Sequence, residues 1–322
     1  MIPSLPILIL DVYSRCNCRC VMCDIWKRTT ARSFEPDELA RQLHAIERLG
    51  VEWVVLTGGE PLMHPALFRL CAPLKERGIR MTLLTTGLLL DRFAREVAGF
   101  VDEVIVSLDG PAEIHDEIRR VPGAFAQLAA GISAVRRIRA RFPVAARSTV
   151  QRANCAHLGR TVEAARALGC DSISFLAADA HSSAFDHDAN AGARNFTLTA
   201  GDIDVLAVEV ERLIDSGECG RFITENPQKL RRLVAQAGWA LGIGEAVAPP
   251  CNAPWVSAVV GVDGSVRPCF FHPPIGTIAS GGELDRVLNA PAAQAFRDGL
   301  DTVTNPVCRR CVCSLNWKGT QR

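Results

Sequence analysis

Short apolar runs alternate with amphipathic stretches over the first 180 residues, and this alternation limits the folds open to the chain. The runs are continuous and rich in β-branched residues, as strands covered on both faces are. We predict six strands, at Ile7–Val12, Trp53–Thr57, Arg80–Leu84, Glu103–Ser107, Val144–Val150 and Ser172–Leu176. Helical stretches lie between them, most clearly at Pro36–Leu49, Pro65–Arg77, Ala124–Arg141 and His157–Leu168. Six strand–helix units predict an α/β fold, a partial (β/α)6 barrel of the TIM type.

The carboxyl ends of the predicted strands carry the polar and glycine-rich signals. A cysteine group follows the first strand, Gly58-Gly59-Glu60 the second, Thr85-Thr86-Gly87 the third and Asp109-Gly110 the fourth. Barrels of this type place their chemistry at that rim. We therefore expect the active site there.

The pattern changes after residue 176. Residues 177–200 are rich in Ala, Asp, His and Ser and predict a long loop over the rim. The loop contains five residues that could bind a metal, but they lack helical spacing, so a solvated loop is favoured over a metal site: Asp179, His181, Asp186, His187 and Asp188. Two helices are predicted next, at Gly201–Ser216 and Pro227–Leu241.

A second module is predicted from residue 245. Ser257–Val262 and Ser265–Phe270 flank Asp263-Gly264, which is typical of a hairpin turn, and short helical stretches follow. We therefore divide the chain into a barrel core at 1–200, connecting helices at 201–244 and a small hairpin-plus-helix domain at 245–322.

Charge and hydropathy exclude several classes of partner. Lys and Arg number 36 against 35 Asp and Glu, so no net field attracts nucleic acid or an anionic membrane. No apolar run reaches the roughly 18 residues of a membrane span, and the first residues lack a secretory signal. We expect a cytoplasmic enzyme.

The thirteen cysteines are the main chemical signal, and their odd number excludes complete disulfide pairing. In the cytoplasm, cysteines in groups are typical of metal sites. Cys71, Cys155, Cys170 and Cys219 stand alone and are expected to be small buried hydrophobes. The others gather near the two ends of the chain.

The first group is Cys16-Asn-Cys18-Arg-Cys20-Val-Met-Cys23, which contains a C-x3-C-x2-C triplet after the first strand. Three thiolates without an obvious fourth ligand suit a cubane iron–sulfur cluster with one iron left open. A zinc site with Cys18 as fourth ligand is the alternative, although such close alternation strains a tetrahedral ion.

The triplet, followed by Thr57-Gly58-Gly59-Glu60-Pro61 after the second strand, resembles the radical S-adenosylmethionine (radical SAM) superfamily over about residues 7–180. The resemblance implies that Cys16, Cys20 and Cys23 hold a [4Fe–4S] cluster whose open iron chelates S-adenosylmethionine. It also implies reductive cleavage to a 5′-deoxyadenosyl radical that abstracts hydrogen from the substrate, with an electron donor such as a flavodoxin or ferredoxin. Gly58 and Gly59 would approach the methionyl group, and Glu60 would either accept from its ammonium or brace the loop.

Further cofactor contacts follow from the same resemblance. Ser107 and Asp109 resemble the ribose-binding edge, and Arg147 with Thr149 would face the cofactor, the arginine opposite its carboxylate. Ile173 and Phe175 would back the adenine. Each of these six residues could equally be part of the core or of a loop. His115, Asp116 and Arg119 are substrate-contact candidates, although a capped, solvated helix is the favoured interpretation. Met22 stands where the family commonly has an aromatic residue, and Cys18 is an extra thiol expected to be a bystander.

The second cysteine group lies in the last 72 residues. Cys251, Cys269 and the C-x2-C pair Cys308 and Cys311 flank the predicted hairpin and resemble the twitch or SPASM-type auxiliary cluster domain. The resemblance implies an auxiliary [4Fe–4S] cluster on these four cysteines, with Cys313 either replacing Cys311 or remaining free. A zinc ribbon with four cysteines is the alternative.

Both resemblances together predict a radical SAM tailoring enzyme of natural product biosynthesis. We expect an oxidoreductase acting on a small molecule or peptide by dehydrogenation, cross-linking or epimerisation. Radical adenosyl transfer to a small molecule or lipid precursor is an alternative, and a non-catalytic zinc or iron–sulfur protein is the alternative from another class.

Overall fold

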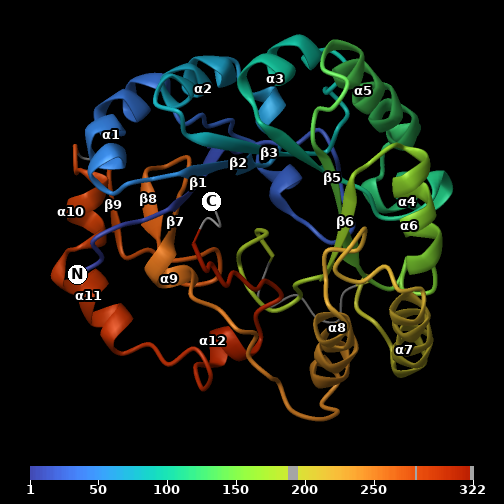
Figure 1. Ribbon diagram of the computed structural model, residues 1–322. Helices are drawn as coiled ribbons and strands as arrows, with labels where there is room; N and C mark the ends of the chain where they lie inside the picture. The colour runs from blue at the N-terminus through green and yellow to red at the C-terminus, as the bar shows by residue number, and fades with distance from the viewer. Residues whose placement is uncertain (188–194, 280, 320–322) are drawn as a thin grey trace.

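A curved parallel sheet with helices on its outer side forms most of the molecule (Figure 1). The computed structural model describes residues 1–187, 195–279 and 281–319. Its main parallel strands are β1 (Ile7–Tyr13), β2 (Trp53–Gly58), β3 (Arg80–Thr85), β4 (Glu103–Ser107), β5 (Val144–Val150) and β6 (Ser172–Ala177). Each matches its predicted range to within one residue, and the predicted partial barrel is confirmed.

The first six helices follow the strands and cover the outside of the sheet (Figure 1). They are α1 (Pro36–Arg48), α2 (Leu67–Glu76), α3 (Ala94–Phe100), α4 (Ala112–Arg119), α5 (Ala124–Ile138) and α6 (Leu158–Ala167). No sequence pattern predicted α3, a helix of only seven residues. Two 3-10 turns, at Ile25–Lys27 and Pro61–Met63, follow β1 and β2.

Side chains alternate between the two faces of the sheet, as strand geometry requires. Leu8, Leu10 and Val12 of β1 are buried against the helices in the main core, whereas Ile9, Asp11 and Tyr13 alternate with them and are only partly buried. The second set faces the inside of the curve. The lumen of the barrel is therefore lined by alternate residues of each strand.

The C-terminal hairpin extends the same sheet. β7 (Ser257–Val260) pairs in parallel with β1, and β8 (Ser265–Arg267) and β9 (Gly276–Thr277) continue in antiparallel register. In the described part of the chain the strand order is β6-β5-β4-β3-β2-β1-β7-β8-β9. Figure 1 shows the orange hairpin beside the blue first strand. The last quarter of the chain is thus joined to the barrel by backbone hydrogen bonds.

The remaining helices close the structure. The two predicted connecting helices are present as α7 (Ala200–Asp215) and α8 (Pro227–Ala240). They pack against each other, and α8 contacts β6. Shorter helices follow at α9 (Ala253–Val256), α10 (Leu284–Leu288), α11 (Pro291–Asp298) and α12 (Pro306–Arg309). No described helix is both long and apolar enough to cross a membrane.

Candidate active site

The first cysteine group lies in the loop after β1, against the end of α4. Cys18 and Cys20 are 1% and 8% exposed, and Cys16 and Cys23 are half-buried. The backbone amides of Arg19 and Val21 donate to the carbonyls of Arg119 and Ile118 at 3.1 and 3.0 Å. Cys18, Cys20, Met22, Ile114, Ile118 and Phe196 form a separate small apolar cluster. Cys18, Cys20 and Met22 are thereby shielded from solvent, whereas Cys16 and Cys23 stay partly exposed.

The thiols of this loop influence one another. Hydrogen bonding with Cys18 and the nearby Arg119 charge lower the pKa of Cys20 to about 6, although burial opposes the shift. Hydrogen bonding with Cys16 and Cys20 raises the pKa of Cys18. Burial raises the pKa of Cys23 to about 12. Neighbouring thiols with a cation beside them have the chemistry of the anionic ligands of an iron–sulfur cluster.

The glycine pair after β2 packs directly on this cysteine loop. A Cβ atom on Gly59 would lie 2.2 Å from the carbonyl oxygen of Arg15, and one on Gly58 would lie 2.5 Å from that of Tyr13. Gly58 also has a φ of +137°, which side chains disfavour. The amides of Gly59 and Glu60 donate to Tyr13 and Arg15 at 2.8 and 2.9 Å. The two sequence motifs are therefore one structural unit.

Glu60 braces this unit. Its carboxylate is fully buried and accepts from the amides of Leu62 and Thr86, at 2.9 and 2.7 Å, and from the hydroxyls of Thr85 and Thr86, at 2.9 and 2.7 Å. Burial raises its pKa despite these donors. Of the two roles expected for Glu60, the structure favours the brace.

A cavity of about 230 Å³, called the cofactor cavity below, lies beside the cysteine loop. Most of the residues predicted to contact the cofactor line it. Cys16, Cys20, Cys23, Gly58, Gly59, Ser107, Arg147 and Thr149 line it. Met22, Thr86, Arg119 and Leu176 also line it, and of these Arg119 was named only as a substrate-contact candidate. Ile173 and Phe175 are instead fully buried in the main core, because they occupy the outward positions of β6. The expectation that they back the adenine is wrong.

Asp109 lies outside this lining and is fully buried. One carboxylate oxygen accepts from the amide of Thr149 at 2.8 Å, and the other lies 2.6 Å from Arg119 Nη2. One oxygen thus accepts a hydrogen bond and the other forms an ion pair, and because the residue does not line the cavity, a ribose contact is without support in this structure.

The helix α4 is not solvated on the side that carries its polar candidates. His115 and Arg119 are 1% and 7% exposed, contrary to the expected capped, solvated helix. Burial lowers the pKa of His115 to about 3, so the ring is neutral, and its Nδ1 lies 3.2 Å from the amide of Asp109. Asp116 accepts from the amides of Gly123 and Phe125 at 2.6 and 2.8 Å and ties α4 to α5.

The loop after β6 forms a wall of the site. Asp179 accepts from the amides of His181 and Ser182 at 3.0 and 3.2 Å, Asp186 pairs with Arg28, and His187 Nδ1 lies 3.4 Å from Asp24. Asp179 and His187 are buried, so this part of the loop is less solvated than expected. Asp188 lies outside the described residues. Over the described ranges, no His, Cys, Asp and Glu side chains come together closely enough to bind a single metal ion.

The second cysteine group lies at the other end of the lumen. Cys251, Cys269, Cys308, Cys311 and Cys313 all line a cavity of about 270 Å³, together with Ile7, Ile9 and Trp53 of the barrel. Burial raises the pKa of Cys308, to about 11, and that of Cys311. The pairing of β7 with β1 brings these five thiols to the barrel interior.

Three residues outside the motif hold the C-terminal cysteines in place. Asn252 pairs with the backbone of Trp317 at 2.7 and 2.8 Å, Arg232 of α8 donates to the carbonyl of Cys311 at 3.0 Å, and Asn305 accepts from the amide of Cys308 at 3.2 Å. His272 Nε2 also lies 3.4 Å from Cys308 Sγ. No local pattern in the sequence identified these contacts.

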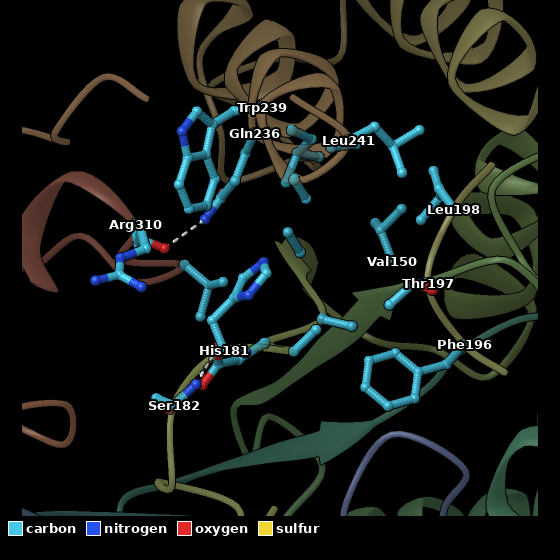
Figure 2. A pocket seen from close by; sticks show the side chains of 18 of the residues that line it. Val150, His181, Ser182, Phe196, Thr197, Leu198, Gln236, Trp239, Leu241 and Arg310 are labelled. Carbon is cyan, nitrogen blue, oxygen red and sulfur yellow. Dashed lines mark hydrogen bonds between the residues drawn. The ribbon is translucent and has the colours of Figure 1, made fainter. Parts of the chain in front are cut away.

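A third cavity, of about 620 Å³, occupies the lumen between the two cysteine groups. Leu84, Arg147, Leu176 and Cys313 line all three cavities, so the cavities are adjacent. A side cavity of about 410 Å³ shares Ala177, Asp179 and Val312 with the cofactor cavity. Figure 2 shows His181, Phe196 and Trp239 around it, with Gln236 bonded to the carbonyl of Arg310. The space between the cysteine groups can hold a substrate in reach of both.

Comparison with known proteins agrees with this geometry. The profile of the radical SAM superfamily matches residues 10–150, and that of the SPASM iron–sulfur cluster-binding domain matches residues 251–312. The chain therefore contains a radical SAM domain and a SPASM iron–sulfur cluster-binding domain. The predicted resemblance is confirmed for both parts, and with it the cofactors: S-adenosylmethionine with a [4Fe–4S] cluster, and an auxiliary iron–sulfur cluster.

Several curated radical SAM relatives match part of the chain. The AdoMet-dependent heme synthase of Methanosarcina barkeri is 34% identical over 164 residues, which are 49% of this chain and 46% of that protein. The PqqA peptide cyclase of Ruegeria pomeroyi is 29% identical over 52% of this chain and 46% of its own. The matches thus span less than half the length of these relatives.

Solved structures share the fold. Streptococcus suis SuiB bound to the precursor peptide SuiA has a TM-score of 0.68 at 14% identity, over 97% of this chain and 72% of that chain. AdoMet-bound anSMEcpe has a TM-score of 0.68 at 17% identity, over 91% and 82% of the two chains.

Proposed function

We propose that this protein is a radical SAM oxidoreductase that abstracts hydrogen from a small natural product or a peptide. The observation that carries the proposal is the lumen cavity, which adjoins one cavity lined by cysteines of the first group and another lined by cysteines of the second group. When bound, the cluster and S-adenosylmethionine supply a 5′-deoxyadenosyl radical. Cys16, Cys20 and Cys23 would hold that cluster, and Cys251, Cys269, Cys308 and Cys311 the auxiliary one.

Different residues of the cofactor cavity would have different roles in binding the cofactor. Gly58 and Gly59 give backbone access beside the cysteine loop, Ser107 offers a hydroxyl, and Arg147 offers a cation for a carboxylate. Arg147 Nε also donates to the hydroxyl of Ser174 on the neighbouring strand β6 at 3.3 Å, which orients the guanidinium. The small apolar cluster around Cys18 and Met22 excludes water from the cysteine loop.

The largest lumen cavity offers polar groups to a substrate. Asp11 Oδ1 and Arg267 Nε are buried and have no hydrogen-bond partner among the described residues. Both line this cavity, whereas neither lines the cofactor cavity. We assign them to the substrate, which would then carry a donor for Asp11 and an acceptor for Arg267.

The names of the relatives and structural neighbours support a substrate that is a small molecule or a peptide. They include heme synthases, a GTP 3′,8-cyclase and a peptide cyclase, and SuiB is described with its precursor peptide. A reduced flavodoxin or ferredoxin would supply the electron. The outcome we favour is dehydrogenation, cross-linking or epimerisation.

Anaerobic reconstitution tests the proposal. The reduced protein should release 5′-deoxyadenosine from S-adenosylmethionine, and changing Cys16, Cys20 and Cys23 together to Ala should abolish release and leave about half the iron, since two cubanes bind equal amounts. Changing the lone Cys155, Cys170 and Cys219 to Ala is the matched control and should retain all the iron. Stoichiometric zinc without 5′-deoxyadenosine would overturn the proposal.

A further inference from the structure

Arg119 brings a buried positive charge to the first cysteine loop. It lies at the end of α4, is 7% exposed, and directs Nη1 to Cys20 Sγ at 3.5 Å. That distance is within the range of a hydrogen bond to sulfur. Arg119 also lines the cofactor cavity, so the guanidinium is part of the wall beside the three cysteines.

The guanidinium is held in place from the side away from the cysteines. Arg119 Nη2 lies 2.6 Å from Asp109 Oδ2, and Asp109 is itself fixed because its other oxygen accepts from the amide of Thr149 at 2.8 Å. The carbonyl of Arg119 accepts from the amide of Arg19, between Cys18 and Cys20. Side chain and backbone therefore tie the same residue to the cysteine loop.

The charge of Asp109 does not cancel that of Arg119 at the cysteines. Arg119 contacts the sulfur of Cys20 directly through Nη1, whereas Asp109 contacts the guanidinium through Nη2. His115, the other titratable group at this contact, is neutral because burial depresses its pKa. A buried cation next to a ligand sulfur is little screened by solvent, and it stabilises the state of a cluster that carries one more negative charge.

We propose that Arg119, positioned by Asp109, sets the reduction potential of the cluster at Cys16, Cys20 and Cys23 through its N–H···S contact with Cys20. Arg119 favours the reduced cluster and so makes the electron needed for cofactor cleavage easier to accept. This inference rests on the proposed ligand assignment of those three cysteines. Arg119 is a positioning and electrostatic residue and not one that reacts with the substrate.

Potentiometric titration followed by electron paramagnetic resonance measures this effect in the reconstituted holoenzyme. The signal that changes when S-adenosylmethionine is added identifies the first cluster, and the auxiliary cluster serves as an internal reference. Asp109→Asn combined with Arg119→Gln removes both buried charges together, which avoids leaving either one unpaired. We expect the first midpoint potential to fall and the auxiliary one to stay in place.

Two further variants keep the test decisive. Arg119→Lys retains the charge and should shift the potential less than the double variant does. Glu113→Gln with Arg160→Gln removes an exposed ion pair, 2.7 Å long, between α4 and α6 and should leave both potentials unchanged. A double variant with full iron content and an unchanged or higher first potential would overturn the inference. The proposed function would survive that outcome, provided that the wild type still shows the signal that responds to S-adenosylmethionine.

Discussion

Gly59 packs against Arg15 so closely that an added Cβ atom would lie 2.2 Å from the arginine's carbonyl oxygen. The glycine pair therefore does more than leave room for a ligand. It allows the loop after β2 to dock on the backbone that leads into Cys16. The geometry of the three cysteines depends on this contact.

Gly59→Ala should displace the first cysteine loop. The contact atoms are backbone and cannot swing aside, so we expect loss of the first cluster and retention of about half the iron. Iron analysis after anaerobic reconstitution measures this, and 5′-deoxyadenosine release should disappear with the cluster. Gly99→Ala is the matched control, because an added Cβ meets nothing within 4 Å. Full iron content in Gly59→Ala would contradict the prediction.

Cys311 and Cys313 should differ in their effect on the auxiliary cluster. Of these three cavities, Cys311 lines only the one of about 270 Å³ that all five C-terminal cysteines share. Cys313 also lines the lumen cavity of about 620 Å³ and the cofactor cavity. We therefore expect Cys311→Ala to lose about half the iron and Cys313→Ala to keep it. The reverse result would make Cys313 the fourth ligand and Cys311 the free thiol.

Asp11 should make the stability of the protein depend on pH. Burial raises its pKa to about 7, and the charges of Asp263 and Asp186 add to the shift, while Arg28 and Arg267 oppose it. The folded state thus keeps the proton of Asp11 up to a higher pH than the unfolded chain does, where the pKa of an aspartate is about 3.9. The contribution of this proton to the free energy of unfolding is accordingly complete below about pH 4 and is lost as the pH rises toward 7. It amounts to at most about 4 kcal/mol.

Asp11→Asn removes this dependence. The melting temperature of the variant should exceed that of the wild type at pH 8, and the difference should shrink or reverse at pH 5. The exposed Glu76→Gln serves as the control and should show no such change between the two values. A difference between Asp11→Asn and wild type that is the same at pH 5 and pH 8 would show that Asp11 titrates normally.

Local patterns in the sequence determined the secondary structure and the ligand chemistry of this protein. The six strands agree with their predicted ranges to within one residue, because continuous apolar runs and helical periodicity depend on neighbours along the chain. The spacing of Cys16, Cys20 and Cys23, with the Gly58-Gly59 pair, sufficed to predict the superfamily. Short elements such as α3 were not predicted, because a helix of so few residues is too short to show a clear periodic pattern.

Tertiary structure decided which polar side chains face the cavities. Asp109 and Ser107 were expected to meet the cofactor together, but the carboxylate of Asp109 turns to Arg119 and Thr149, and only Ser107 lines the cavity. The pairing of β7 with β1, some 250 residues apart, brings the C-terminal cysteines to the lumen. Such contacts arise from packing between distant segments, so the burial of Asp109, Arg119 and Asp11 follows from the assembled barrel and from no local pattern.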